Sequence, residues 1–174
     1  MLGYFSKLTP CLIGMEACGS AHYWARELGK LGHEVRLMAP QFVKPYVKSG
    51  KNDANDAEAI CEAVGRPNMR FVAIKTAEQQ VIQAEHRIRA RLIKSRTALS
   101  NEVRGLLGEL GIVGETSIGR LRKALPELLE DSENGLPMSF RVLLAGLGEE
   151  LRALDDSITA FDAGIAQRAR EDGR

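Results

Sequence analysis

The sequence has few cysteines and histidines and no long apolar segment. Its three cysteines form no CxxC pair, and their odd number is typical of reduced thiols in a cytoplasmic protein. We expect no structural zinc site. No apolar run approaches the roughly 20 residues that a membrane helix needs. The N-terminal residues MLGYFSKLTP also lack a basic region followed by an apolar core, so we expect neither a membrane segment nor a signal peptide.

What is present is typical of a globular domain, with 44% hydrophobic and 27% charged residues in a chain of 174. The net charge is only +1, but it is divided unevenly along the chain. Residues 86–104 contain six Lys or Arg against one acid, Glu102, whereas the C-terminal residues lean acidic. Such segregation indicates binding partners more clearly than the total charge does.

The first part of the chain alternates strand and helix patterns. PCLIGMEACG, residues 10–19, is an apolar run that predicts a buried strand, and HEVRLMAP, residues 33–40, alternates as a second strand would. Between them we expect Ser20 to cap a helix with apolar positions at Ala21, Trp24, Ala25, Leu28 and Leu31. This βαβ pattern predicts parallel strands with a right-handed crossover, and RFVAIK, residues 70–75, is a third candidate strand.

The second part is almost purely helical. A long helix is expected over residues 77–110, with Ile88, Leu92, Leu99, Val103, Leu106 and Leu110 on one side. SIGRLRKALPELLED predicts a shorter helix broken at Pro126. The last helix repeats apolar residues in a 3, 4 pattern that predicts a coiled-coil seam, namely Leu144, Leu147, Leu151, Leu154, Ile158, Phe161 and Ile165. The seam indicates packing, either on the long basic helix of the same chain or on a second chain.

Three carboxylates stand out in the α/β part. In GKNDANDAEAICEAVG, residues 50–65, a helical face from Asp53 would carry Asp53, Asp56, Ala57, Ile60 and Val64, which aims two acids along the apolar face. Glu16 ends the first predicted strand, and sites in open α/β sheets form beyond the carboxyl ends of strands. Clustered carboxylates are the oxygen ligands that Mg²⁺ or Mn²⁺ prefers, and such ions serve phosphodiester chemistry. Alternatively, Asp53 is an ordinary helix N-cap, with Asp56 as an acidic residue in the first turn.

The wording of GMEACG, LMAPQFVKPYVK and KNDANDAEAI resembles the DEDD-type insertion-sequence transposases, whose relatives include pilin-gene invertases. The resemblance continues through RPNMRFVAIKTAEQQ and LRKALPELLEDSENGLP and so covers nearly the whole chain. It implies a ribonuclease H-like, RuvC-like catalytic domain followed by a coiled-coil segment. In that family four acids bind divalent metal and act on DNA. Glu16 falls on the E position, and Asp53 and Asp56 fall on the last two D positions.

The chain departs from the family pattern at both ends. No acid occurs among the fifteen residues before Glu16, where the family has its first D, and the family's C-terminal serine domain has no counterpart. We therefore expect an internal or truncated piece of a transposase, with little or no catalysis by this chain alone. Some family members are directed to their DNA targets by a guide RNA. The resemblance therefore implies guide RNA as a second partner beside DNA.

Two stretches are candidates for contact with nucleic acid. The first places Lys44, Lys48 and Lys51 beside Phe42 and Tyr46, directly before the aspartates. The alternative is that the lysines are merely solvated and the aromatic rings pack under the sheet. The second is the long helix, where Arg87, Arg91 and Lys94 lie near one face and Arg89 and Arg96 near another. Here the alternative is pairing with the acidic C-terminal helix.

These observations predict two regions. Residues 1–75 should form a partial RuvC-like domain with two to three parallel strands, and residues 76–174 a helical region that ends in the coiled coil. The expected function is that of a transposase fragment which binds DNA and, when complete, cleaves and exchanges DNA strands with Mg²⁺ or Mn²⁺. The alternative function is a non-catalytic nucleic-acid-binding or dimerising remnant. An unpaired sheet edge and the seam both predict a homo-oligomer.

Overall fold

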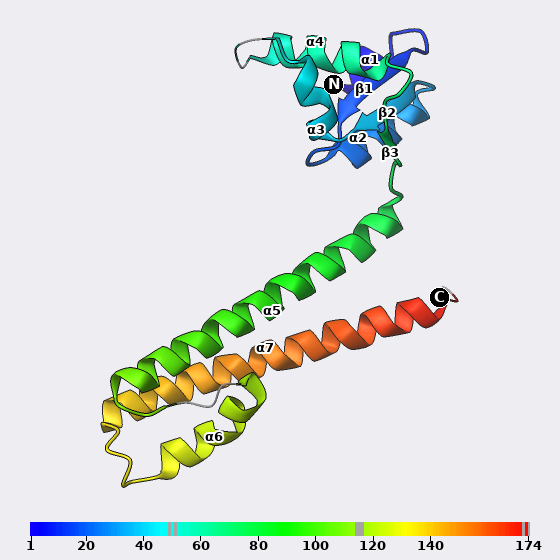
Figure 1. Ribbon diagram of the computed structural model, residues 1–174. Helices are drawn as coiled ribbons and strands as arrows, with labels where there is room; N and C mark the ends of the chain where they lie inside the picture. The colour runs from blue at the N-terminus through cyan, green and yellow to red at the C-terminus, as the bar shows by residue number, and fades with distance from the viewer. Residues whose placement is uncertain (49, 51, 114–116, 172, 174) are drawn as a thin grey trace. The chain divides into compact units, whose positions relative to one another are not determined.

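In a computed structural model, the described residues are 1–48, 50, 52–113, 117–171 and 173. They divide into two compact units, residues 1–81 and residues 82–174 (Figure 1). The helix α5, Ala77–Glu109, begins in the first unit and continues in the second. Every helix in the described part of the chain is too short or too polar to cross a membrane.

The first unit is built on a mixed sheet in the order β1-β2-β3. Strands β1, Leu12–Glu16, and β2, Glu34–Met38, pair in parallel, so that Glu16 lies opposite Met38. The short strand β3, Phe71–Val72, pairs antiparallel with β2. The prediction of parallel strands is therefore correct for the first two and wrong for the third. Strand β3 follows α4 after a short connection and pairs with Leu37 and Met38, at the carboxyl end of β2.

Helices cover both faces of this sheet. The helix α2, Ala21–Lys30, lies on one face, where Ala21, Ala25 and Leu37 form a buried cluster. On the other face, α3, Pro40–Val43, the 3₁₀ helix η1, Lys44–Tyr46, and α4, Asp53–Val64, pack around Met38 (Figure 1). A short helix, α1, Leu2–Phe5, precedes β1. Ser20 stands at the N-cap position of α2 with φ 66° and makes no side-chain capping hydrogen bond, contrary to a conventional cap.

Gly14 is where β1 and α4 come closest. A Cβ atom added at Gly14 would lie 2.9 Å from Cβ of Val64 and 3.1 Å from Cγ2 of Ile60. Real Cβ atoms do not approach neighbours so closely, so only glycine allows α4 to lie this near the strand. The glycine sets the spacing between the helix and the sheet.

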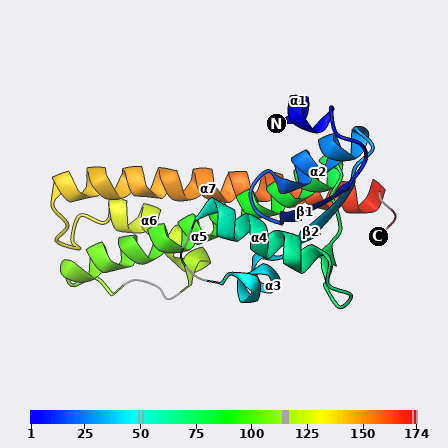
Figure 2. The same ribbon diagram turned by 90° about the horizontal axis from the view of Figure 1, so that it is seen from above.

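The second unit is entirely helical over its described residues. The helices α5, α6, Ile118–Glu130, and α7, Met138–Glu171, enclose one apolar cluster, and Figure 2 shows α6 beside the first half of α7. The cluster contains Leu99, Val103, Leu107, Leu121, Leu125, Leu136, Leu144 and Leu151. All seven residues of the predicted α7 seam are buried or half-buried, which confirms that this side packs. In this structure it packs within one chain.

Two details of the helical prediction were wrong. Pro126 lies inside α6 and does not break it. Leu121 and Leu125 form the buried face of α6. Pro126 is exposed, and so is Arg122, whose backbone carbonyl loses its helical hydrogen bond to the proline. On α5 the predicted apolar side was wrong at Ile88 and Leu110, which are 39% and 43% exposed, and the fully buried residue near the end of the helix is Leu107.

Candidate functional site

The first turn of α4 is capped by Asn52, whose Oδ1 accepts a hydrogen bond from the backbone N–H of Asn55 at 2.8 Å. Neither aspartate is therefore the N-cap residue, which was the structural alternative for Asp53. Asp53 is exposed and Asp56 is half-buried. The predicted apolar face was partly wrong, because Ala57 is exposed and the buried residues are Ala59, Ala63 and Val64. The true stripe runs through Asp56, Ala59, Ile60, Ala63 and Val64, with Asp53 one turn earlier at the exposed end.

Glu16 lies on the same face of the sheet as α4. Side chains alternate along a strand, so Glu16 projects to the side toward which Gly14 faces, and Gly14 faces Ile60 and Val64. Its register partner Met38 is fully buried in the cluster under α4. Glu16 itself is half-buried. The sheet and the helix thus bring a strand-end glutamate and an acidic helix turn to one side of the first unit.

The three carboxylates are not assembled around one ion. In the described ranges, no three Asp, Glu, His or Cys side chains are grouped so that they could hold a metal. Carboxylate oxygens have the donor chemistry that Mg²⁺ and Mn²⁺ prefer. The carboxylates of Glu16, Asp53 and Asp56 are therefore suitable ligands for such an ion, but their positions in the structure do not form a three-ligand site.

The lysines near α4 differ in their surroundings. Lys44, at the start of η1, is exposed. Nζ of Lys48 lies 2.6 Å from Oε1 of Glu58, and this hydrogen bond raises the pKa of Lys48. Lys51, the third predicted contact, lies outside the described residues. Lys44 is consequently better placed than Lys48 to meet an added phosphate.

The basic residues of α5 separate into two groups by helix face. Arg89 pairs with Asp162 of α7, and Nη1 of Arg96 lies 2.9 Å from Oδ1 of Asp155. Within the described part of the chain, Arg87, Arg91 and Lys94 are exposed and have no carboxylate partner, and we name these three residues the basic face. The pairing alternative therefore holds for Arg89 and Arg96, while contact of the basic face with nucleic acid stays a prediction.

Asp155 connects all three helices of the second unit. Its carboxylate, only 13% exposed, accepts from Arg96 of α5 and Arg122 of α6. Burial opposes its ionisation most strongly, but the hydrogen bonds and charges of the two arginines together outweigh burial and lower the pKa of Asp155 below its ordinary 3.8. The carboxylate therefore remains charged at acidic pH and holds α5 and α6 to α7.

Replacing Asp155 by asparagine should lower the free energy of unfolding of the second unit by about 1–2 kcal/mol at pH 7. Because the folded pKa lies below the unfolded value, this stabilisation is complete above that value and is lost as the pH falls through the folded pKa. Urea unfolding followed by far-UV circular dichroism should show the difference between wild type and variant shrinking below pH 3.8. A difference that grew on acidification would contradict the assignment.

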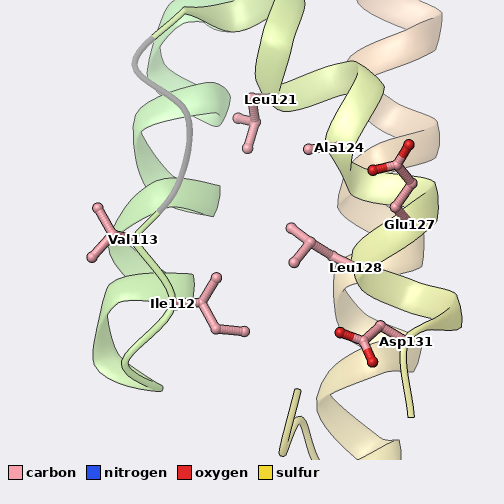
Figure 3. A pocket seen from close by; sticks show the side chains of 7 residues that line it. All are labelled: Ile112, Val113, Leu121, Ala124, Glu127, Leu128 and Asp131. Atoms are coloured by element: carbon pink, nitrogen blue, oxygen red, sulfur yellow. The ribbon is translucent and has the colours of Figure 1, made fainter. Parts of the chain in front are cut away.

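The second unit also contains an apolar hollow of about 320 Å³. Figure 3 shows Leu121, Ala124 and Leu128 of α6 facing Ile112, while the side chain of Val113 points away and the carboxylates of Glu127 and Asp131 lie on the α6 side. Of these residues, Leu121 is fully buried and belongs to the core cluster. The two carboxylates belong to exposed residues and, among the described residues, form no group with other metal-ligating side chains, so we assign this hollow no chemical role.

Sequence reasoning missed residues whose roles depend on folding. Arg26 donates to the Lys75 carbonyl and to Oε1 of Gln80, each at 2.6 Å, and ties the residues before α5 to α2. Nδ1 of His22 accepts from the Lys75 backbone N–H at 3.2 Å, and burial followed by the charges of Lys75 and Arg26 lowers the pKa of His22. A spacing of about fifty residues gives no local pattern, so no sequence signal could have paired them.

A family model described as transposase, of the DEDD type and named for IS110, matches residues 1–112 of the chain. The match includes the sheet, Glu16, α4 with both aspartates, and α5 with its basic face. No solved structure matches the chain.

Curated relatives agree over almost the whole chain. A "Probable family 20 transposase" of Pseudomonas aeruginosa is 54% identical over 172 residues, covering 98% of this chain and 51% of the relative. The "Transposase for insertion sequence element IS1111A" of Coxiella burnetii is 46% identical, over 97% of this chain and 48% of the relative. The "Transposase for insertion sequence element IS1328" of Yersinia enterocolitica is 37% identical, over 97% of this chain and 50% of the relative. The chain thus spans about half the length of the curated relatives it matches.

Proposed function

Because the chain belongs to the IS110 family of DEDD transposases, we propose that it forms the part of a transposase that binds DNA and supplies carboxylates for strand cleavage and exchange. The observation that carries the proposal is the shared sheet face of Glu16 and α4, inside the segment that matches the family model. Because the chain spans about half the length of its relatives, in this proposal the acids act together with further residues of the complete enzyme.

Each residue has a specific task in this proposal. Glu16, Asp53 and Asp56 provide anionic oxygens on one side of the sheet, and the exposed Lys44 attracts the DNA backbone toward them. A divalent ion such as Mg²⁺ or Mn²⁺, when bound to these oxygens, would polarise the scissile phosphate and lower the pKa of the attacking group. Since the three carboxylates are not gathered in the structure, binding requires movement of their side chains or further ligands.

Binding of Mn²⁺ tests the carboxylate assignment. We expect added Mn²⁺ to broaden the NMR signals of Glu16 and of the first turn of α4 by paramagnetic relaxation. Glu16→Gln and Asp53→Asn should each weaken Mn²⁺ binding by about tenfold, because each removes a charged donor.

Glu58→Gln is the matched control, since it removes a carboxylate of the same helix that is bound to Lys48. Broadening that is unchanged in Glu16→Gln, or that follows Glu58 instead, would refute the assignment. Mn²⁺-dependent nicking of branched DNA by this chain, abolished by Asp53→Ala, would show that it cleaves DNA without a fourth acid.

The basic face of α5 gives a separate prediction about DNA. Arg91→Ala should reduce the slope of log affinity against log salt for duplex DNA by about 1, because one phosphate contact is lost. Arg89→Ala is the control on the same helix, as Arg89 is already bound to Asp162. Fluorescence anisotropy at several salt concentrations measures both slopes. Equal slopes for the two variants would remove the basic face from the interface.

A second function is favoured by one observation, the absence of a grouped three-ligand set in the described residues. In that case the chain is a non-catalytic nucleic-acid-binding or dimerising protein that keeps the scaffold. It would bind DNA through the basic face, and Glu16→Gln would leave Mn²⁺ binding unchanged. Sedimentation of the chain tests the homo-oligomer that both functions include, and a monomer at all concentrations would exclude it.

A further inference from the structure

A hollow of about 270 Å³ opens in the first unit, between η1 and the turn that follows α4. It is lined by Phe42, Pro45, Tyr46, Arg66, Asn68, Met69 and Arg70. Sites for drug-sized ligands have volumes of about 300–1,000 Å³, so a hollow just below that range suits a smaller flat group. Aromatic and aliphatic side chains on one side and polar groups on the other are what a nucleobase requires.

One wall of the hollow is a fixed, flat cation. The guanidinium of Arg66 lies 5.5 Å from the ring centroid of Tyr46. It also donates a hydrogen bond to the carboxylate of Glu62, one turn earlier on α4. Tyr46 itself packs against the cluster around Met38, which holds its ring in place. Because guanidinium planes stack on bases as aromatic rings do, Arg66 extends the tyrosine into a stacking surface.

The rim carries polar groups that are not used within the described structure. Arg70 is exposed and has no carboxylate partner in the described ranges. Asn68 is exposed in a turn closed by a hydrogen bond from the Met69 N–H to the Arg66 carbonyl at 3.2 Å. An amide can pair with the edge of a base, and a free guanidinium can hold the adjoining phosphate.

We infer that this hollow, the base pocket, holds one unpaired nucleotide of a DNA strand. The base stacks on Arg66 and Phe42, Asn68 meets its edge, and Arg70 holds the phosphate. Charge favours this occupant. Among the described residues that line the hollow none is a carboxylate, and Glu62 is already bound to Arg66, so Arg70 and the sequence neighbour Lys44 leave net positive charge at the opening. The inference rests on the proposed DNA-binding function and extends it to a single-stranded substrate.

Binding of short single strands tests the inference, in EDTA so that the metal question does not enter. With fluorescein-labelled dT₁₂, Arg66→Ala should weaken binding by about 5- to 150-fold, the range for loss of one stacked base. Arg70→Ala should weaken it by about 3- to 10-fold and reduce the salt slope by about 0.7. Lys30→Ala, an equal change of charge on α2, should alter the affinity by less than about twofold.

Two further measurements separate the base from the backbone. An oligonucleotide of the same length with abasic positions should bind wild type as weakly as dT₁₂ binds Arg66→Ala. The fluorescence of a 2-aminopurine base should be quenched by wild type and less so by Arg66→Ala. Equal binding of abasic and normal strands, or no effect of Arg66→Ala in a folded variant, would overturn the base pocket.

Two comparisons complete the test. The first distinguishes DNA from RNA, and the second distinguishes failure of the base pocket from failure of the carboxylate proposal. Binding of rU₁₂ tenfold tighter than dT₁₂ would overturn the assignment to DNA. Loss of Mn²⁺ binding in Asp53→Asn with intact dT₁₂ binding would leave both proposals standing. Single-strand binding that ignores Arg66 and Arg70, together with normal Mn²⁺ broadening, would refute only the base pocket.

Discussion

Replacing Leu144 by alanine is expected to lower the free energy of unfolding of the helical unit by about 2–5 kcal/mol, the range for a large aliphatic side chain removed from a core. Leu144 is fully buried, and its cluster draws leucines from all three helices, including Leu107 and Leu121. None of these helices has a second apolar cluster among the described residues. The cavity left by alanine would therefore weaken the contacts of α5, α6 and α7 together.

The matched control lies two residues earlier on the same helix. Val142 is 64% exposed, so Val142→Ala should change the free energy of unfolding by less than about 0.5 kcal/mol. Urea titration followed by circular dichroism at 222 nm measures the helical unit. Fluorescence of Trp24, the one tryptophan of the chain, measures the first unit and should not shift in Leu144→Ala. Equal effects of the two variants would contradict the described core.

The second large effect concerns the spacing of α4 from the sheet. Gly14→Val places a branched side chain where even a Cβ atom would lie 2.9 Å from Val64 Cβ. Val64 Cβ sits next to the backbone and cannot rotate away, so the helix or the strand must shift. We expect a loss of about 1–3 kcal/mol in the first unit, read from Trp24 fluorescence in urea.

Gly29 provides the comparison, since a Cβ atom there meets nothing within 4 Å. Gly29→Ala lies in α2 and should stabilise the unit by up to about 1 kcal/mol, because alanine is the better helix former. Gly14→Val should also reduce Mn²⁺ binding, because it displaces α4 relative to Glu16. A Gly14→Val protein as stable as wild type would show that α4 does not rest on this strand.

The elements that sequence could predict are those with a clear apolar pattern. The apolar spacing of α2 and α7, the apolar run of β1 and the alternation of β2 were sufficient to predict these elements. Strand β3 has only two residues, which is too short for a period to reveal its direction. The family resemblance identified Glu16, Asp53 and Asp56 as metal ligands. The structure puts Glu16 on the sheet face that α4 covers but does not gather the three carboxylates, so the assignment stays a prediction.

The remaining features depend on contacts that no local pattern encodes. The burial of Ala59 and Ala63 instead of Ala57 follows from how α4 lies on Gly14, which is a property of two distant segments. The base pocket likewise joins η1 to a turn some twenty residues later. In RPNMR, residues 66–70, two arginines flank a turn, but only the fold sets Arg66 against Tyr46.

The division of the α5 arginines has a consequence for how this protein can change. Asp162 of α7 forms an ion pair with Arg89, which lies on α5 beside the basic face but is not part of it. A substitution such as Asp162→Ala on α7 would release the guanidinium of Arg89 and so add a free cation to α5. Mutations in α7 can therefore change the affinity for a polyanion without touching the ligand, because the acids of α7 determine how many arginines of α5 are free to bind it.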